Sequence, residues 1–192
     1  MKQDETRLRL IEGTIRTIAR EGLDKASTKQ IGLATSINEA YIYRFFEDKD
    51  DLLCRTFEAL DNELVLVALS SVSALTEEGR SIEEKARTLF RIIWRFMLDN
   101  SARCLAYIRL YYSPYFKNNL IEAHTERYKP LLELLKSQFL TEADVWMILN
   151  HILSTMIDFA VKVFNGQVQD SADTEEHVFR VVYRSVEQYF KK

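Results

Sequence analysis

Residues that interrupt or cross-link secondary structure are scarce in this sequence. Its 192 residues include five Gly, two Pro and two Cys. Because these helix breakers are so few, the chain is not of the Gly- and Pro-rich, low-complexity class, and long helices are favoured. Cys54 and Cys104 lack the spacing of a redox or zinc motif, which excludes a disulfide-braced scaffold. We expect two buried free thiols in a reducing compartment, with a redox-sensing pair as the alternative.

Sequence patterns typical of catalysis and metal binding are also missing. The three histidines, His124, His151 and His177, are scattered, so no single helix carries a metal site. The sequence has no Gly-rich phosphate loop and no recognisable grouping of nucleophile and base. Acidic pairs such as Glu83–Glu84 are typical of solvated helix starts, where the helix dipole favours them. We predict no enzyme, no cofactor and no metal.

Targeting segments and a strong excess of one charge are absent as well. The first ten residues lack the apolar core of a signal peptide, and polar residues such as Asp158 and Lys162 interrupt the most apolar segment, 145–164. We therefore predict a cytoplasmic protein with no membrane partner. The net charge is −3, and the first 55 residues carry ten basic and ten acidic side chains. This balance counts against sequence-blind nucleic-acid binding but not against a specific contact face.

Two short helices joined by a tight turn are predicted after residue 27. Ser27 is a favourable N-cap, and Gln30 follows at the spacing of a capping box. Asn38 can cap a second short helix, and Asp48 can cap a third helix that opens with Lys49. Two helices that cross through such a turn form a helix-turn-helix, whose second helix can lie in the major groove of DNA.

This segment resembles the DNA-binding domain of the TetR (tetracycline-repressor-like) family of bacterial regulators. That family's pattern is roughly Thr, Ile-Ala, a Gly-Val-Ser-type turn, Tyr-x-(Tyr/Phe)-Phe and Lys-(Glu/Asp)-x-Leu. The matching residues are Thr28, Ile31, Ala34, Ile37, Asn38, Ile42, Tyr43, Phe45, Phe46, Lys49, Asp51 and Leu52. Residues 11–22 resemble the family's first helix, which ends at a Gly suited to a left-handed cap. Beyond the first 55 residues, the resemblance extends only to length and helical layout.

Three positions depart from the family pattern. Ser36 stands at the turn Gly, Glu39 replaces a small or basic residue, and Ala40–Tyr41 replaces a Gly-Thr or Ala-Thr pair. An acidic side chain that faces DNA phosphates lowers affinity, although Glu can accept a hydrogen bond from cytosine N4. These departures bear more on which operator is read than on whether the motif exists.

The resemblance implies an all-α protein of about nine helices. Residues 1–48 are expected to form a three-helix, helix-turn-helix DNA-binding domain, and residues 49–192 a helical ligand-binding and dimerisation domain. The predicted phosphate contacts are Thr28, Tyr43 and Lys49, the first and last because helix N-termini favour anions.

Base reading is expected from the start of the second helix of the motif. The candidates are Asn38, Glu39, Tyr41 and Arg44. Lys2, Arg7 and Arg9 form either a flexible arm on DNA or a solvated helix start. In isolation, Thr28, Tyr43 and Lys49 also fit a helix cap, a core-edge aromatic and a solvated lysine.

The last two predicted helices are the best candidates for a dimer surface. One runs from residue 141, capped by Thr141, to residue 164, and the other from Asp173 or Thr174 to Phe190. Their apolar surface favours a four-helix bundle made by two chains, with monomeric core packing as the alternative. A two-fold dimer reads a palindromic operator. Pro130 should kink or break the preceding helix.

The middle helices are rich in aromatic residues, which line a core more often than a pocket. The resemblance implies a cavity there for a small-molecule effector. The ligand candidates are Trp94, Met97, Tyr107, Tyr111, Thr155, Asp158 and Phe159. Asp158 fits a cavity that binds a cationic or hydrogen-bond-donating ligand, or an ion pair at the dimer surface.

The function implied by the resemblance is that of a bacterial DNA-binding transcriptional regulator. The expected form is a repressor that binds a palindromic operator as a homodimer and is released by a small-molecule effector. The effector and the operator sequence are unknown. The alternative is a co-regulator of the same family that acts through protein partners without sensing a ligand.

Overall fold

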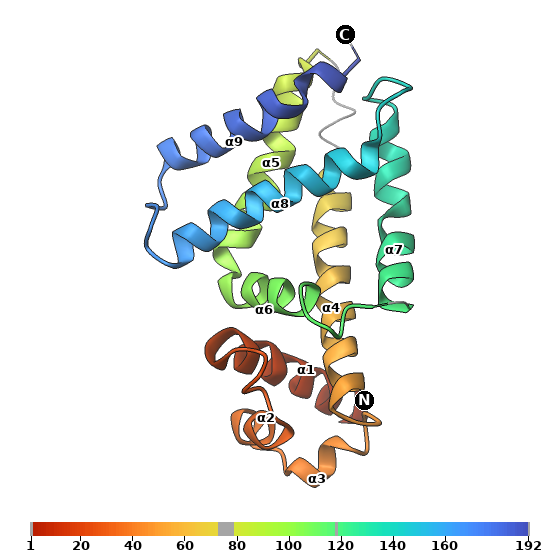
Figure 1. The fold of residues 1–192 in the computed structure, drawn as a ribbon, viewed down its shortest axis with the longest axis vertical. Helices are drawn as coiled ribbons and strands as arrows, with labels where there is room; N and C mark the ends of the chain where they lie inside the picture. The colour runs from red at the N-terminus through yellow and green to blue at the C-terminus, as the bar shows by residue number, and fades with distance from the viewer. Residues whose placement is uncertain (1, 73–78, 118, 192) are drawn as a thin grey trace. The chain divides into compact units, whose positions relative to one another are not determined.

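The computed structural model describes residues 2–72, 79–117 and 119–191, and within these ranges the fold is all α-helical, as predicted (Figure 1). The described residues form nine α-helices, a 3-10 helix at Glu187–Tyr189 and one isolated β-bridge, with no extended strand. The helices are α1 Lys2–Glu21, α2 Thr28–Thr35, α3 Glu39–Ile42, α4 Lys49–Ser71, α5 Ile82–Asp99, α6 Ser101–Tyr111, α7 Asn119–Lys136, α8 Val145–Phe164 and α9 Ala172–Val186.

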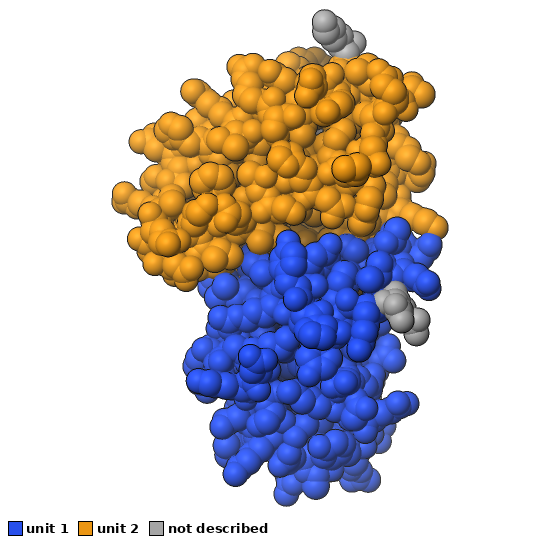
Figure 2. Space-filling view, viewed as in Figure 1, with its two compact units in different colours: residues 1–63, 101–126 blue, residues 64–100, 127–192 orange. Residues whose placement is uncertain are grey.

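The chain divides into two compact units, coloured separately in Figure 2. Unit 1 comprises residues 1–63 and 101–126, and unit 2 comprises residues 64–100 and 127–192. Helices α4 and α7 therefore contribute to both units. The predicted boundary between residues 48 and 49 concerns which residues bind DNA. It stays a prediction, because a division by compactness does not test it.

Unit 1 is built on α1, which packs against both α2 and α6. Its buried face carries Leu10, Ile15 and Ile18, at the spacing that places residues on one side of a helix. The Arg109 guanidinium of α6 donates to the carbonyl oxygens of Ile18 and Ala19, 2.9 Å away for Ala19. These carbonyls lie in the last turn of α1, where the Ile18 carbonyl also accepts from the Gly22 amide at 3.0 Å. Arg109 therefore fastens the end of α1 to α6.

Glycines allow α2 to approach its neighbours closely. A Cβ on Gly13 would lie 2.0 Å from Cγ2 of Thr35, and a Cβ on Gly32 would lie 2.8 Å from the carbonyl oxygen of Ile37. Real Cβ atoms do not approach other atoms so closely, so a larger residue would displace α2 or the turn after it. Gly22 has φ +90° and follows the last residue of α1, as expected for a left-handed cap.

Unit 2 packs α5 against both α8 and α9 around an apolar core. An ion-pair ladder covers the seam between α5 and α9. Arg91 and Arg95 both contact Glu175, at 3.0 and 2.7 Å, and Arg87 pairs with Glu176. The 14% exposure of the Glu175 side chain makes it the least accessible carboxylate of the ladder.

Two predicted helix features are wrong in detail. Helix α8 is capped by Asp144, whose side chain accepts from the Met147 amide at 3.0 Å, and not by Thr141. The residues in between form a turn. Helix α9 is capped by Ser171 and ends at Val186, because the chain then tightens into the 3-10 helix. Helix α7 continues through the exposed Pro130, so the helix does not break there, while a kink at this residue stays a prediction.

Helix α8 is the most apolar element in the described part of the chain. By length and composition alone, it is the one helix there that could cross a membrane. Only 22% of its most apolar window is buried within this chain.

Candidate nucleic-acid interface and ligand cavity

The turn between α2 and α3 is closed by backbone hydrogen bonds at a left-handed residue. Ser36 has φ +56°, and the Ile37 amide donates to the Gly32 carbonyl at 3.0 Å. This is the C-terminal motif that usually places Gly at the left-handed position. Asn38 then caps α3 by accepting from the Ala40 amide at 2.9 Å. The sequence therefore builds the predicted helix-turn-helix despite the missing turn Gly.

Three aromatic and basic side chains form the exposed face of α3 and the turn after it. Tyr41 is 39% exposed and Tyr43 is 52% exposed. The Arg44 guanidinium lies 4.9 Å from the centre of the Tyr41 ring, and Phe45 packs edge-on against that ring at 5.4 Å. These contacts hold Tyr41 in place before any partner binds, so the face presents a phenol and a guanidinium in a fixed arrangement.

An acidic side chain covers the start of α2. The Thr28 hydroxyl, on a residue only 8% exposed, donates to the carboxylate of Glu39. Free amides and the helix dipole favour an anion at this helix start, and Glu39 supplies one from within the chain. Lys49, the first residue of α4, is half-buried. Asp48 caps that helix by accepting from the Asp51 amide at 2.8 Å.

All seven predicted DNA contacts lie on the stretch that runs from the start of α2 to the start of α4. Their roles on DNA stay predictions. Arg7 and Arg9 belong to α1 and do not form a flexible arm: Arg9 donates to the Thr35 carbonyl at 3.1 Å, and the Arg7 guanidinium lies 5.7 Å from the Phe46 ring. The side chain of Lys2 lies outside the described part of the structure.

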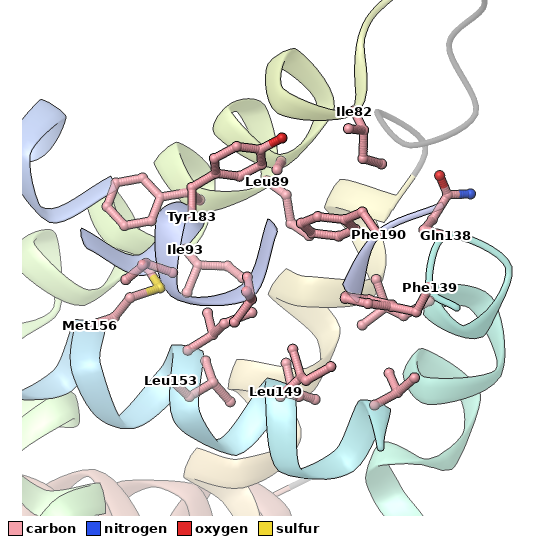
Figure 3. Close-up of a pocket in the computed structure, with 18 of the residues that line it drawn as sticks. Ile82, Leu89, Ile93, Gln138, Phe139, Leu149, Leu153, Met156, Tyr183 and Phe190 are labelled. Carbon is pink, nitrogen blue, oxygen red and sulfur yellow. The ribbon is translucent and has the colours of Figure 1, made fainter. Parts of the chain in front are cut away.

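Unit 2 encloses an apolar cavity of about 90 Å³ (Figure 3). Helices α5, α8 and α9 supply its walls, with Phe139 and Phe190 at one end and Met156 toward the other. Gln138 and Tyr183 are the polar residues among those that line it, and none of the lining residues is charged.

The end wall of this cavity is made where the C-terminal segment pairs with the segment after α7. Phe139 and Phe190 form the isolated β-bridge, and their rings stack at 4.6 Å. The Leu140 amide donates to the Tyr189 carbonyl at 2.8 Å, and the Lys191 amide donates to the Gln138 carbonyl at 3.0 Å. Residues far apart in sequence thus close the cavity together.

The seven predicted ligand residues lie elsewhere, and none of them is among the lining residues of this cavity. Trp94 and Met97 are buried on α5, and the Trp94 indole N–H has no hydrogen-bond acceptor among the described residues. Tyr107 and Tyr111 stack at 5.9 Å within unit 1. Whether any of the four contacts an effector stays a prediction.

The three polar and aromatic candidates of α8 lie toward its accessible side. Asp158 is 60% exposed and pairs with Lys162 one helical turn away, at 2.5 Å. Lys162 also lies 4.9 Å from the ring of Phe159. Thr155 donates to the His151 carbonyl at 2.9 Å, a local bond within the helix. Their proposed contact with a ligand stays a prediction too.

A buried acid–imidazole pair in unit 1 was not predicted. The Nδ1 atom of His124 lies 3.0 and 3.1 Å from the two carboxylate oxygens of Asp61, which is fully buried. The Tyr107 hydroxyl donates to the same carboxylate at 3.4 Å. The rings of Phe57 and Phe116 lie 6.2 and 5.6 Å from the imidazole. The sequence carries one sign of this pair: the acidic residue Asp61 lies on the apolar face of α4, one helical turn after Phe57.

The two cysteines are free thiols, as expected, but both residues are half-buried and not fully buried as predicted. Burial raises the pKa of Cys104 to about 12. Burial, followed by the carboxylates of Asp51 and Asp50, raises the pKa of Cys54. Among the described residues, no group of three or more His, Cys, Asp or Glu side chains is arranged to hold a metal ion.

Residues 10–55, the stretch that contains this turn and its three helices, match the family model for bacterial regulatory proteins of the tetR family. This stretch is a DNA-binding domain of the TetR family. The all-helical fold of the chain and its helix-turn-helix are those expected of a TetR-family transcription regulator.

A curated relative of this chain is an uncharacterised helix-turn-helix transcriptional regulator from Haemophilus influenzae. It is 27% identical over 121 residues, which cover 62% of each protein, so the match spans less than two thirds of that relative's length. A solved TetR-family transcription regulator from Marinobacter aquaeolei has a TM-score of 0.81 at 19% identity, with both chains covered completely. Another, from a Shewanella species, has a TM-score of 0.75 at 16% identity, covering 97% of this chain and 98% of the other. At these identities, the solved structures show a shared fold.

Proposed function

We propose that this chain is a bacterial transcription regulator of the TetR family, a repressor that binds a palindromic operator as a homodimer and is released by a small-molecule effector. The observation that carries the proposal is the exposed, pre-arranged face of Tyr41, Tyr43 and Arg44, next to the start of α2. An aromatic ring can contact a thymine methyl, and a guanidinium can pair with guanine or a phosphate. The regulator is expected to act in the cytoplasm, where bacterial DNA lies.

The charge of this face favours specific over indiscriminate binding. Arg44 and Lys49 are the basic residues proposed to contact DNA, while Glu39 already holds the Thr28 hydroxyl. When a phosphate approaches the start of α2, Glu39 has to release Thr28 or turn toward a base. DNA affinity then depends on a base that can bind the released Glu39 carboxylate, such as a cytosine whose amino group donates a hydrogen bond to it.

Accessible apolar residues on α8 and α9 support the dimer. Met147 on α8 is 68% exposed and Val181 on α9 is 52% exposed, while α8 buries little of its apolar surface within one chain. His151 and Ser185 join the two helices by a hydrogen bond of 2.9 Å, which fixes their spacing. A two-fold pairing of this face gives two equivalent DNA-reading surfaces, and hence a palindromic operator.

Effector release requires that the ligand-bound and DNA-bound states differ in free energy. The apolar cavity of unit 2 supports a ligand site, and α4 supports coupling because one continuous helix contributes residues to both units. A coupling free energy of about 1–3 kcal/mol is typical of such systems.

Selection of bound duplexes from a random DNA pool tests the DNA-binding part. We expect one enriched palindrome, with affinity that falls steeply as salt rises. Tyr41→Ala should weaken binding to it by about 1–3 kcal/mol and relax the choice of one base pair, while Lys49→Ala should reduce the salt slope by about one. Arg20→Ala, an exposed change at the far end of α1, is the control. No enrichment at low salt contradicts the proposal.

Sedimentation of the free protein tests the dimer. Wild type should sediment as a dimer at micromolar concentration, and Val181→Arg should sediment as a monomer because it buries a charge in the proposed interface. Lys29→Ala, an exposed change in unit 1, should leave the dimer intact. A monomeric wild type that still selects a palindrome contradicts the α8–α9 pairing.

A second candidate function is that of a co-regulator acting through protein partners. Glu39 favours it, because an acidic residue stands where the family places a small or basic one. Four carboxylates, at residues 47, 48, 50 and 51, also surround the start of α4. A DNA selection without enrichment, combined with no ligand binding to the cavity, would move this function to first place.

A further inference from the structure

We infer that the unit 2 cavity is a binding site for an unbranched alkyl chain, with the polar end of the ligand held outside the cavity at the Gln138 end. This deepens the proposed effector response and rests on the proposed function only for its effect on DNA. The lining of the cavity, its shape and the way its end is closed all favour such a ligand.

The lining excludes a charged or strongly polar ligand. Its surface is aliphatic and aromatic side chains together with Gln138 and Tyr183, and none of the lining residues carries a charge. Moving an ionised group into such surroundings without a partner costs several kcal/mol, so it would stay in water. Figure 3 shows the Gln138 amide and the Tyr183 hydroxyl directed away from the apolar interior.

The shape favours a chain over a ring. Lining residues on α8 run from Val145 to Met156, and those on α5 run from Ile82 to Ile93; at 1.5 Å per residue, each stretch spans about 16 Å. The cavity offers a volume of about 90 Å³ along this length. So little volume spread over such a length makes a narrow channel.

The cavity is also unsuited to water. A buried water needs two to four polar partners, and the polar groups of Gln138 and Tyr183 point elsewhere. Filling the space with hydrocarbon restores the dispersion contacts that its walls lack. A longer chain would enter by displacing Phe139 and Phe190, which are held by two main-chain hydrogen bonds of the C-terminal segment and by the stacking of Phe190 on Phe139 and Tyr183.

Calorimetric titration with 1-octanol, in the absence of DNA, tests the site. We expect saturable binding with a negative heat-capacity change, as apolar burial requires. The branched isomer 2-ethyl-1-hexanol tests the shape of the cavity. Sodium octanoate tests where a charged end of the ligand lies. The branched alcohol should bind about tenfold more weakly because it does not fit a narrow channel, whereas octanoate should bind with its carboxylate in water.

Two variants fill the cavity from opposite walls, and a third is the matched control. Ala86→Leu and Leu153→Phe should each weaken 1-octanol binding about tenfold or more, while Ala172→Leu, at an exposed position of α9, should leave it unchanged. Circular dichroism shows whether each variant is folded. If one cavity variant does not fold, the other alone tests the site.

Lack of saturable binding, equal binding of the two isomeric alcohols, or unchanged affinity in a folded cavity variant overturns the inference. These outcomes do not depend on DNA and leave the operator selection to be judged separately. Octanol that binds the cavity without releasing a selected operator supports the site and contradicts only the effector part of the proposed function.

Discussion

Replacing His124 by Leu is expected to destabilise the protein by about 3–5 kcal/mol. The change keeps an apolar group of similar size in the aromatic surroundings but removes the imidazole that lies 3.0 and 3.1 Å from the Asp61 oxygens. Asp61 is fully buried, so its carboxylate cannot turn to water when the imidazole is gone. The expected cost is that of a buried charge left without this partner, and it exceeds the usual effect of a point substitution.

A double variant separates the charge from the packing. Asp61→Leu combined with His124→Leu removes both polar groups and should be close to wild type, within about 1–2 kcal/mol, because a buried pair gains little over apolar side chains of similar volume. The two single substitutions should therefore be strongly non-additive. His177→Leu, an exposed histidine on α9, should change stability by less than about 0.5 kcal/mol.

Urea unfolding at one fixed protein concentration measures these differences. Circular dichroism follows all helices, while tryptophan fluorescence follows unit 2, because Trp94 and Trp146 both belong to it. A His124→Leu cost below about 1 kcal/mol would refute the reasoning. So would a double variant that is as unstable as the single one, because packing and not charge would then dominate.

Three further predictions concern the DNA-reading face and the thiols. Ser36→Gly should stabilise the protein by about 0.5–1 kcal/mol in urea unfolding, because a left-handed φ of +56° strains Ser but not Gly; a loss of stability would contradict this. If the proposed DNA binding holds, Glu39→Gln should tighten binding to non-operator DNA about fivefold in fluorescence anisotropy, since it removes a negative charge beside phosphates; Glu21→Gln is the control, and unchanged affinity would place Glu39 away from the phosphates. For the thiols, Cys54 should be alkylated before Cys104 in timed mass spectrometry. The Cys104 pKa of about 12 leaves about one thiolate in ten thousand at pH 8, and its rate should rise about tenfold per pH unit up to that value; comparable rates at pH 8 would contradict the burial argument.

Local features of the fold could be predicted from the sequence. Ser27, Asn38 and Asp48 all cap the helices expected of them, because a cap depends on a side chain and an amide two or three residues away. The same holds for the Ser81–Glu84 capping box of α5. Ser27, Asn38 and Asp48 all lie within residues 10–55, the stretch that matches the family model.

Features that join distant segments could not be predicted in this way. Asp61 and His124 meet because α4 and α7 pack together in unit 1, and neither helix alone shows that its polar residue has a partner. The cavity was missed for a different reason. Its lining is mostly aliphatic, whereas the sequence argument sought aromatic and polar residues as signs of a pocket.

The arginine ladder between α5 and α9 makes one wall of the cavity sensitive to the ionic environment of the cell. Its ion pairs lie partly in solvent, with Arg91 58% and Arg95 42% exposed, so salt screens them over distances of about 10 Å at 0.1 M. Added salt either strengthens the apolar contacts beneath these ion pairs or leaves them unchanged. Under osmotic stress, ions become concentrated in the bacterial cytoplasm. The ion pairs of the ladder would then weaken, while the apolar core beneath them keeps its contacts. If the cavity is the proposed ligand site, ligand affinity at this wall should therefore change with salt concentration.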